Sequence, residues 1–266
     1  MKTLGERDEL RNTSSRGTRT LGALSIVGVV FLGLLGLWWS PKDSDMGDLV
    51  RIMYIHVPSA WIAYMAFIIT AMGSVMFLWK RSVWWDLVAG ASAEIGVLFC
   101  ALALATGSLW GRPTWGTYWR WGDARIVTTL VLLLMYVGYL ALRRVDGDPT
   151  QRSKRAAIVG LIAAGNIPVV RYSVDWWSNR TLHQKATVGL DTKLDNFPLF
   201  TLMFGLVVFT IVFSWMLLHR FRIAWLENEL EQGGLERALV ERRAEGRLTA
   251  DRPMAVAEAQ TVEVRP

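Results

Sequence analysis

Residues 57–79 read VPSAWIAYMAFIITAMGSVMFLW, a run that contains no charged side chain. A helix of about 20 apolar residues is long enough to cross the hydrocarbon core of a bilayer, and this run exceeds that length. The composition of the whole chain agrees, because 52% of its 266 residues are hydrophobic and its mean hydropathy is +0.29. The stretch therefore indicates a membrane protein and excludes an ordinary soluble domain.

Five more apolar runs flank this one. They comprise residues 21–39, 87–110, 126–142, 156–170 and 197–218. The run 87–110 holds one charge, Glu94, which is either a functional carboxylate or a protonated acid bonded to a neighbouring helix. The short run 156–170 contains Asn166 and Pro168, which we expect to break the helix near its outer end. We predict an all-α integral membrane protein, a bundle of six transmembrane helices.

The distribution of Lys and Arg predicts the orientation. With six spans both termini lie on one side, and that side carries more Lys and Arg near the membrane, so we expect both termini to be cytoplasmic. No small-residue cleavage site follows the first span, which favours a retained anchor over a signal peptide. The expected organisation is a cytoplasmic segment 1–20, a transmembrane domain 21–218 and a cytoplasmic tail 219–266.

The tail 219–266 changes in composition along its length. Its first part has helical spacing, which we expect Gly233 and Gly234 to stop before a second short helix. From Leu248 onwards the small and polar residues indicate disorder.

Charge and cysteine content exclude several function classes. The net charge of +6 reflects the positive-inside pattern and is no sign of nucleic-acid binding. Cys100 is the single cysteine and no C-x-x-C-H stretch occurs, so the chain is neither a thiol oxidoreductase nor a c-type cytochrome. The sequence has no G-x-x-x-x-G-K-[ST] motif, which excludes a P-loop nucleotide site of its own.

Residues 110–125 read WGRPTWGTYWRWGDAR and form the second of three predicted outer loops. An interfacial aromatic belt explains most of the 14 tryptophans, but it places only one or two rings at each helix end. This loop has four, namely Trp110, Trp115, Trp119 and Trp121. We expect Trp115 and Trp119, four positions apart, to share one face of a helical turn.

The composition of this loop suits a flat anionic ligand. Indole faces stack on a porphyrin, and glycine lets the backbone approach a planar partner closely. The glycines are Gly111, Gly116 and Gly122. Arginine forks match carboxylates such as haem propionates. The arginines are Arg112, Arg120 and Arg125. A quinone-like or flavin molecule would suit the same loop.

Two of the three histidines lie on the predicted outer face. His56 is at the mouth of the second span and His183 is in the third outer loop, whereas His219 ends the sixth span on the cytoplasmic side. Two imidazoles can occupy both axial positions of a haem iron, while a zinc site would want three or four protein ligands. Two histidines are thus enough for a haem iron, and the alternative for His56 and His183 is a hydrogen-bonded polar group at the level of the lipid headgroups.

The segments YIHVPSAW, ATGSLWGRPTWG and NIPVVRYSVDWW, with the loop 110–125, resemble the WWD-signature haem-handling proteins. Within that group the chain resembles the CcmC family of cytochrome c maturation. The resemblance implies outer-face loops that bind haem b transiently and without a covalent bond, with His56 and His183 as axial ligands of its iron. The residues implied to present that haem to a chaperone, CcmE, are Trp110, Trp115, Trp119, Trp121 and Asp123.

The same resemblance implies partners and a location. The partners are CcmE, the ABC-type subunits CcmA and CcmB, the small protein CcmD and membrane lipid. The location is the bacterial cytoplasmic (inner) membrane, and the chain would be a multi-pass transport component that works with an ATPase and is not itself an enzyme. One departure is an extra residue, Gly122, between Trp121 and Asp123. We expect Gly122 to form a bulge with positive φ, so that Asp123 still reaches its place.

Two other interpretations stay open at this point. A haem lyase of the same superfamily would form thioether bonds, but such proteins are longer and have more spans. A non-haem transporter subunit would use the loop 110–125 only as an aromatic belt.

Overall fold

The structure is a computed structural model that describes residues 15–43, 46–183 and 194–262. Within these ranges the chain is helical, apart from loops and one isolated bridge between Asp43 and Gly47. Six helical stretches are long and apolar enough to cross a membrane. They are Arg16–Trp39, Asp48–Lys80, Val83–Trp115, Ala124–Leu142, Pro149–Trp176 and Asn196–Gly234. The predicted all-α fold with six spans is confirmed.

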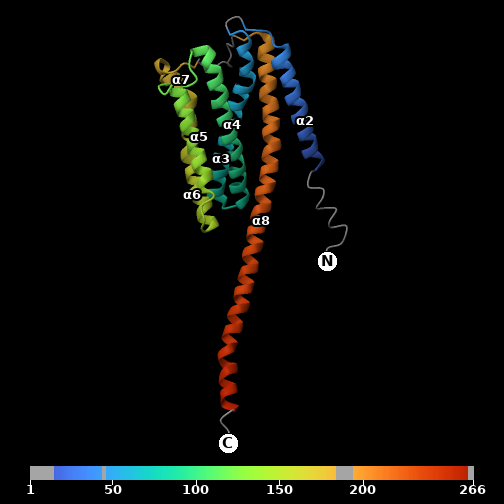
Figure 1. The fold of residues 1–266 in the computed structure, drawn as a ribbon, viewed down its shortest axis with the longest axis vertical. Coiled ribbons are helices and arrows are strands. Elements are labelled where there is room, and N and C mark those ends of the chain that lie inside the picture. Colours follow the sequence, from blue (N-terminus) through green and yellow to red (C-terminus); the bar gives the residue numbers. More distant parts are fainter. Residues whose placement is uncertain (1–14, 44–45, 184–193, 263–266) are drawn as a thin grey trace. The chain divides into compact units, whose positions relative to one another are not determined.

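The spans follow one another in alternating directions through the bundle, with α6 and α7 as two parts of one span (Figure 1). Their bounds are α2 (Arg16–Gly33) with the π-helical turn η1 (Leu34–Trp39), the 3-10 turn η2 (Asp48–Ile52), α3 (Met53–Lys80), α4 (Val83–Trp115), α5 (Ala124–Leu142), α6 (Pro149–Ala164), α7 (Asn166–Trp176), the 3-10 turn η3 (Ser178–Arg180) and α8 (Asn196–Val262). We call the end that carries residues 40–43, 46–52, 116–123 and 177–183 the loop end.

The fifth span is interrupted, as Asn166 and Pro168 led us to expect. Proline has no N–H to donate, and its ring clashes with the carbonyl four residues earlier. For Pro168 that carbonyl belongs to Ala164, the residue at which α6 ends before Gly165 and the start of α7. The span is longer than predicted, because the two helices together cover Pro149–Trp176.

Small residues bring α3 and α4 into close contact in the middle of the bundle. A Cβ atom added to Gly96 would lie 2.6 Å from the Phe67 ring. The Phe67 ring in turn stacks on Tyr136 of α5, with centroids 3.8 Å apart and planes 4° apart. Without a hydrophobic driving force between helices in lipid, such close packing of small and aromatic residues holds the spans together.

The part of α8 before Arg222 packs against α2 in the same way. A Cβ atom added to Gly22 would lie 3.0 Å from the Trp215 indole, and one added to Gly28 would lie 3.0 Å from Val208. Residues Met1–Phe221 form one compact unit and Arg222–Pro266 form a second.

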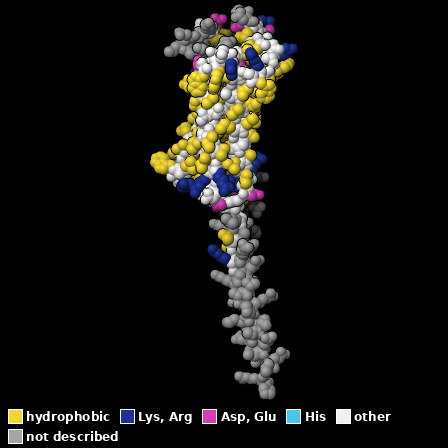
Figure 2. Space-filling view, turned by 90° about the vertical axis from the view of Figure 1, so that its left-hand side faces the viewer, with side chains coloured by type: hydrophobic (Ala, Val, Ile, Leu, Met, Phe, Trp, Pro, Cys, Tyr) yellow, Lys and Arg dark blue, Asp and Glu magenta, His cyan; other side chains and the backbone are white. Residues whose placement is uncertain are grey.

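One face of the bundle is a hydrophobic band with Lys and Arg at its two ends (Figure 2).

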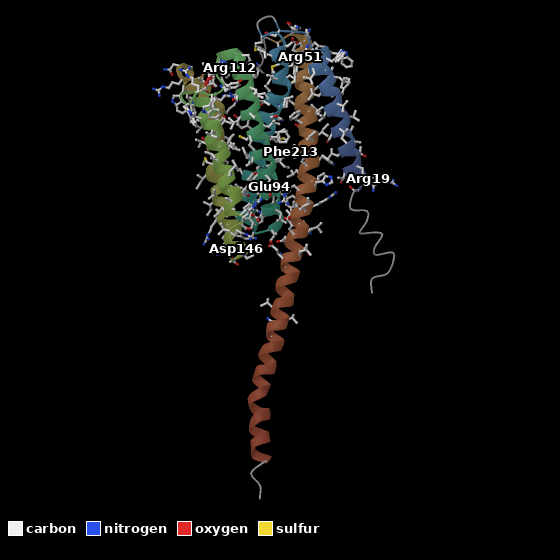
Figure 3. All side chains as sticks on the ribbon, in the orientation of Figure 1. Arg19, Arg51, Glu94, Arg112, Asp146 and Phe213 are labelled. Carbon is white, nitrogen blue, oxygen red and sulfur yellow. The ribbon has the colours of Figure 1, made fainter. Side chains whose placement is uncertain are left out.

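Two ion pairs join helices away from the loop end. Arg143 donates to both carboxylate oxygens of Asp86, at 2.5 and 2.9 Å, and Ser153 donates to the same acid at 2.9 Å. This network ties α4, α5 and α6 together. Arg220 of α8 donates to both oxygens of Glu94, which lies between the two ends of the bundle (Figure 3). Glu94 is therefore bonded to a neighbouring helix, through the guanidinium of Arg220.

The helix α8 does not stop at Gly233 and Gly234, contrary to our expectation, and it continues to Val262. Each glycine costs about 1 kcal/mol of helix propensity relative to alanine. The flanking stretches LENELEQ and LERALVERRAEGR consist mostly of strong helix formers, which offset that cost. The disorder that we expected from Leu248 is likewise contradicted as far as Val262.

Candidate functional site

The loop end brings together three segments that are far apart in the sequence. They are the residues before α3, the connection between α4 and α5, and the residues after α7. Arg51 and Arg112 lie at this end, whereas Arg19 and Asp146 lie at the opposite end (Figure 3). The three predicted outer loops therefore meet at one end of the bundle.

The helix α4 ends at Trp115 because Gly116 adopts a left-handed conformation, with φ 77°. That conformation is costly for any residue with a Cβ atom. Trp119 follows this turn, so our expectation that Trp115 and Trp119 share a helical face is wrong. Gly111 is needed for a different close approach than we expected, since an added Cβ atom would lie 3.1 Å from the Thr117 carbonyl oxygen of the same loop.

Gly122 does not form the bulge that we expected. It is absent from the described residues with positive φ, and a Cβ atom added to it would meet nothing within 4 Å. Trp121 and Gly122 instead form a turn that delivers Asp123 to the start of α5. The extra residue is absorbed by this turn without a conformation that only glycine adopts.

Asp123 is a buried acid, with 1% of its surface exposed. One carboxylate oxygen caps α5 by accepting the Ile126 N–H at 2.9 Å. The other accepts the Leu182 N–H at 2.6 Å, from the segment after α7. Burial acts to raise the pKa of Asp123, but attraction to the His183 ring and these two backbone N–H groups outweigh it, so the pKa lies below its usual range. Asp123 is a carboxylate at neutral pH.

His56 lies in the first turn of α3 with its ring turned toward α4. Its Nδ1 is 3.0 Å from the Ala103 carbonyl oxygen and 3.1 Å from the Thr106 hydroxyl. The ring also meets Trp110 edge-on, with centroids 5.8 Å apart. A Cβ atom added to Gly107 would lie 2.9 Å from His56 Cε1. The absence of a side chain at Gly107 therefore leaves room for the imidazole.

His183 approaches the same region from the segment after η3. Its ring packs against Trp115, with centroids 4.9 Å apart. Its Nδ1 lies 3.6 Å from Asp123 Oδ1, which is an electrostatic contact and too long for a direct hydrogen bond. Both histidines therefore direct Nδ1 toward oxygen atoms of the protein.

His56 and His183 line one cavity of about 710 Å³, a volume that includes open solvent at its mouth. Its walls come from α3, α4 and α5, and they are mostly apolar. The other lining residues are Ala60, Ala63, Tyr64, Cys100, Ala103, Leu104, Gly107, Trp119, Arg125, Ile126, Thr129 and Leu132. A concave, mainly apolar site with a few converging polar groups is typical of a small-molecule or cofactor site.

Buried nitrogen atoms without hydrogen-bond partners gather at the loop end. Within the described part of the chain they are Arg51 Nε, Trp110 Nε1, Trp119 Nε1, Arg125 Nε and His183 Nδ1. Three of these residues, Trp119, Arg125 and His183, line the cavity. Such donors would suit a ligand with carboxylate groups, because an unsatisfied buried polar atom in a native protein usually has a partner in its functional state.

The other predicted site residues lie outside the cavity lining. Trp121 is 74% exposed and meets Trp119 edge-on at 5.4 Å. Arg112 is exposed, donates to the Gly116 carbonyl at 2.6 Å and lies over the Tyr118 ring. Arg120 is exposed as well. Of the three arginines proposed to meet a ligand, Arg125 is therefore the one that the fold brings to the cavity.

Sequence reasoning missed the residues that hold His56 in place. Ala103, Thr106 and Gly107 face the ring from α4, one turn before the tryptophans. The signal was present, because Thr106 and Gly107 belong to the stretch ATGSLWGRPTWG, but that stretch was interpreted only as part of a resemblance. The histidine His219 lies in α8 against Trp215, with ring centroids 5.1 Å apart, and does not line the cavity.

Comparison with known proteins adds an independent finding. A family described as Heme exporter protein C matches residues 1–235 of the chain. The matched residues include all six candidate spans and both cavity histidines.

Individual relatives agree with the family match. The Heme exporter protein C of Bradyrhizobium diazoefficiens is 42% identical over 217 residues, which cover 80% of this chain and 79% of the relative. The Heme exporter protein C of Escherichia coli K12 is 39% identical over 168 residues, which cover 62% and 67%. A putative cytochrome c biosynthesis ccmC-like mitochondrial protein of Marchantia polymorpha is 38% identical over 155 residues, which cover 58% and 64%.

Proposed function

The chain belongs to the Heme exporter protein C family, and from this premise we propose that it holds haem between His56 and His183 and delivers it to a chaperone. Membership of this family supports a role in haem delivery for cytochrome c maturation, as a transport or handling component. The ligands, the acceptor and the direction of delivery are the proposal.

One observation carries the ligand assignment: His56 and His183, from distant parts of the sequence, line the same cavity. In each ring Nδ1 faces oxygen atoms of the protein, so Nε2 is the nitrogen that we propose to bind iron. A metal-binding imidazole commonly has this arrangement, with one nitrogen toward the metal and the other toward a protein acceptor.

The rest of the cavity suits a porphyrin that is cargo and not a resident group. Its walls are apolar and include the Trp119 indole, on whose face a macrocycle gains both area burial and stacking. Trp119 Nε1 and Arg125 Nε are donors without protein acceptors, and the two propionates of haem b are acceptors. Non-covalent binding is consistent with later release.

Delivery would use the exposed side of the loop 110–125. Trp121 is exposed and contacts Trp119, a cavity residue, so a partner that covers Trp121 would lie next to the bound haem. We propose a CcmE-like chaperone as this partner. CcmA, CcmB and CcmD would complete the assembly, and the ATPase subunit would supply the nucleotide site. Both termini would be cytoplasmic and the loop end periplasmic, in the bacterial inner membrane.

The ligand assignment is tested by replacing each histidine with alanine in the purified full-length protein. We expect His56→Ala and His183→Ala each to lose most of the haem and to change the Soret and α bands of what remains. His219→Ala is the matched control, since that ring packs on Trp215 away from the cavity. If both cavity variants keep the wild-type spectrum and haem content, the assignment is wrong and an aromatic belt is the better interpretation of the loop.

Delivery is tested separately with Trp121→Ala. We expect haem content to stay close to that of the wild type, while transfer to a purified CcmE-like chaperone and cytochrome c maturation in a deletion strain both fall. The control is Trp38→Ala, another strongly exposed tryptophan that lies in η1. Equal transfer by the wild type and Trp121→Ala would contradict the proposed contact.

A further inference from the structure

We propose that Asp123 is a positioning residue for His183. Its carboxylate fixes the segment that carries the His183 ring, and it accepts the Nδ1–H of that ring when Nε2 binds iron. This rests on the proposed function, because it treats His183 as a haem ligand. The resemblance had implied that Asp123 presents haem to a chaperone, but the side chain is buried and offers no surface to a partner.

The two oxygens of Asp123 join segments that are far apart in the sequence. Oδ1 caps α5 through the Ile126 N–H, whereas Oδ2 accepts the Leu182 N–H at 2.6 Å across 59 positions. A helix N-cap requires only the first of these bonds. The second attaches residue 182 to the start of α5, and so determines where the adjacent His183 lies.

The His183 ring lies against the same carboxylate. Its Nδ1 is buried, has no hydrogen-bond partner and is 3.6 Å from Asp123 Oδ1. A ligating imidazole nearly always donates its second N–H to a carboxylate, a carbonyl or water, which fixes the ring and makes it a stronger ligand. Asp123 is the carboxylate in place to accept that proton donor.

The environment of His56 is different, because only neutral oxygens face its Nδ1. They belong to the Ala103 carbonyl and the Thr106 hydroxyl. One proposed ligand is thus supported by an anion and the other by neutral groups. A negative charge behind an axial imidazole increases donation to iron and favours the ferric over the ferrous state. Removal of that charge is therefore expected to raise the midpoint potential of the bound haem.

Two substitutions in the full-length protein separate positioning from helix capping. Serine caps helices about as well as aspartate, but its side chain is too short to bond Ile126 and reach Leu182 at once, so Asp123→Ser keeps the cap and loses the link. Asp123→Asn keeps the size but loses the charge and one of the two acceptors, because an amide nitrogen cannot accept an N–H. Asp148→Asn is the matched control, because Asp148 is an exposed aspartate that caps α6 by accepting the Gln151 N–H and does not line the cavity. Haem titration, spectroelectrochemical titration and gel filtration in detergent are applied to each.

We expect Asp123→Ser to remain monodisperse and to bind haem roughly 10–100-fold more weakly, and Asp123→Asn to have a higher midpoint potential than Asp148→Asn or the wild type. If Asp123→Ser keeps wild-type affinity and Asp123→Asn keeps the wild-type potential while His183→Ala loses its haem, Asp123 is a helix cap only and the proposal is overturned. If His183→Ala keeps its haem, the proposed function fails first.

Discussion

The two ends of the bundle treat buried polar groups in opposite ways. Away from the loop end, Asp86 and Glu94 are each bonded by both oxygens to an arginine of another helix. At the loop end lie the five buried nitrogens that, within the described part of the chain, have no acceptor. The first end uses these polar groups to join helices, whereas the loop end, where Asp123 is also fully bonded, holds polar groups without a partner as well.

We expect this difference to separate residues that stabilise the bundle from residues that bind a ligand. An unsatisfied buried donor costs about 1–3 kcal/mol, so a cluster of them persists where a ligand uses them. A bonded ion pair holds the helices together, but its donors and acceptors are already used and do not serve a ligand. We therefore expect substitutions at the two ends to affect different measurements, stability at one and haem binding at the other.

The largest effect is expected for Asp86→Ala, which leaves Arg143 buried without its partner. Breaking a buried ion pair from one side destabilises a protein by roughly 3–5 kcal/mol, and both side chains are mostly buried, at 10% and 19% exposed. Thermal unfolding in detergent measures the loss. The haem that the folded fraction binds is expected to keep its wild-type spectrum.

The double variant Asp86→Leu with Arg143→Met serves as its control. Replacing both members of a buried pair by apolar residues is often close to neutral, so much of the stability should return. A change of the haem spectrum in Asp86→Ala would show that the two ends are coupled and would break the comparison.

Next in size is Gly107→Ala, which acts at the loop end. The added methyl group would lie 2.9 Å from His56 Cε1, so the ring must leave its hydrogen bond to Ala103. We expect about a tenfold loss of haem affinity, equivalent to about 1.4 kcal/mol, with little change in unfolding temperature. Gly138→Ala, in α5 with open space around it, is the matched control. Equal haem affinity in the two variants would argue against His56 as a ligand.

A smaller effect is expected for Glu94→Gln. The pair with Arg220 is about one-third exposed in the chain, at 34% and 31%, and a glutamine keeps a side-chain oxygen that can accept a hydrogen bond from Arg220. The unfolding temperature should fall slightly and haem affinity should stay unchanged. Reduced haem binding with normal stability would instead make Glu94 a functional carboxylate.

The smallest effect is expected for Gly122→Val, because Gly122 has no positive φ and open space around it. The free energy of unfolding should stay within about 0.5 kcal/mol of the wild type, as for most surface substitutions. Haem content and cytochrome c maturation should stay unchanged. Gly116→Val is the informative contrast, since φ 77° costs a residue with a Cβ atom about 1–2 kcal/mol. If Gly122→Val is harmful, that result would support the bulge hypothesis, which the structure contradicts.

The spans were predictable because a single physical constraint determines them. A helix in lipid must be apolar for about 20 residues, and six such runs can be found from the sequence by local inspection. The break near Asn166 and Pro168 was predictable for the same reason, since the missing N–H of proline acts on its own helix. Family membership, expected from the tryptophan loop and the histidine segments, is confirmed by the comparisons.

The finer parts of the site depend on contacts between distant segments. Nothing near Asp123 in the sequence indicates that it accepts a bond from Leu182, and nothing near Glu94 indicates Arg220. The error at Gly122 has a similar origin, because an extra residue can be absorbed by a turn as well as by a bulge. The role of the left-handed glycine belongs to Gly116, where α4 has to end.

The pair of Glu94 and Arg220 also has a consequence in time. The two residues are 126 positions apart, and ribosomes add about 5–20 residues per second, so Glu94 is made roughly 6–25 s before its partner. A charged carboxylate inside a bilayer is costly, so we expect Glu94 to destabilise the nascent helix in the membrane until α8 is inserted. A chain truncated after Leu218 lacks Arg220. We expect membrane proteases to degrade this chain faster than the same truncated chain with Glu94→Gln. Pulse-chase labelling of the two truncated chains would measure the difference in lifetime.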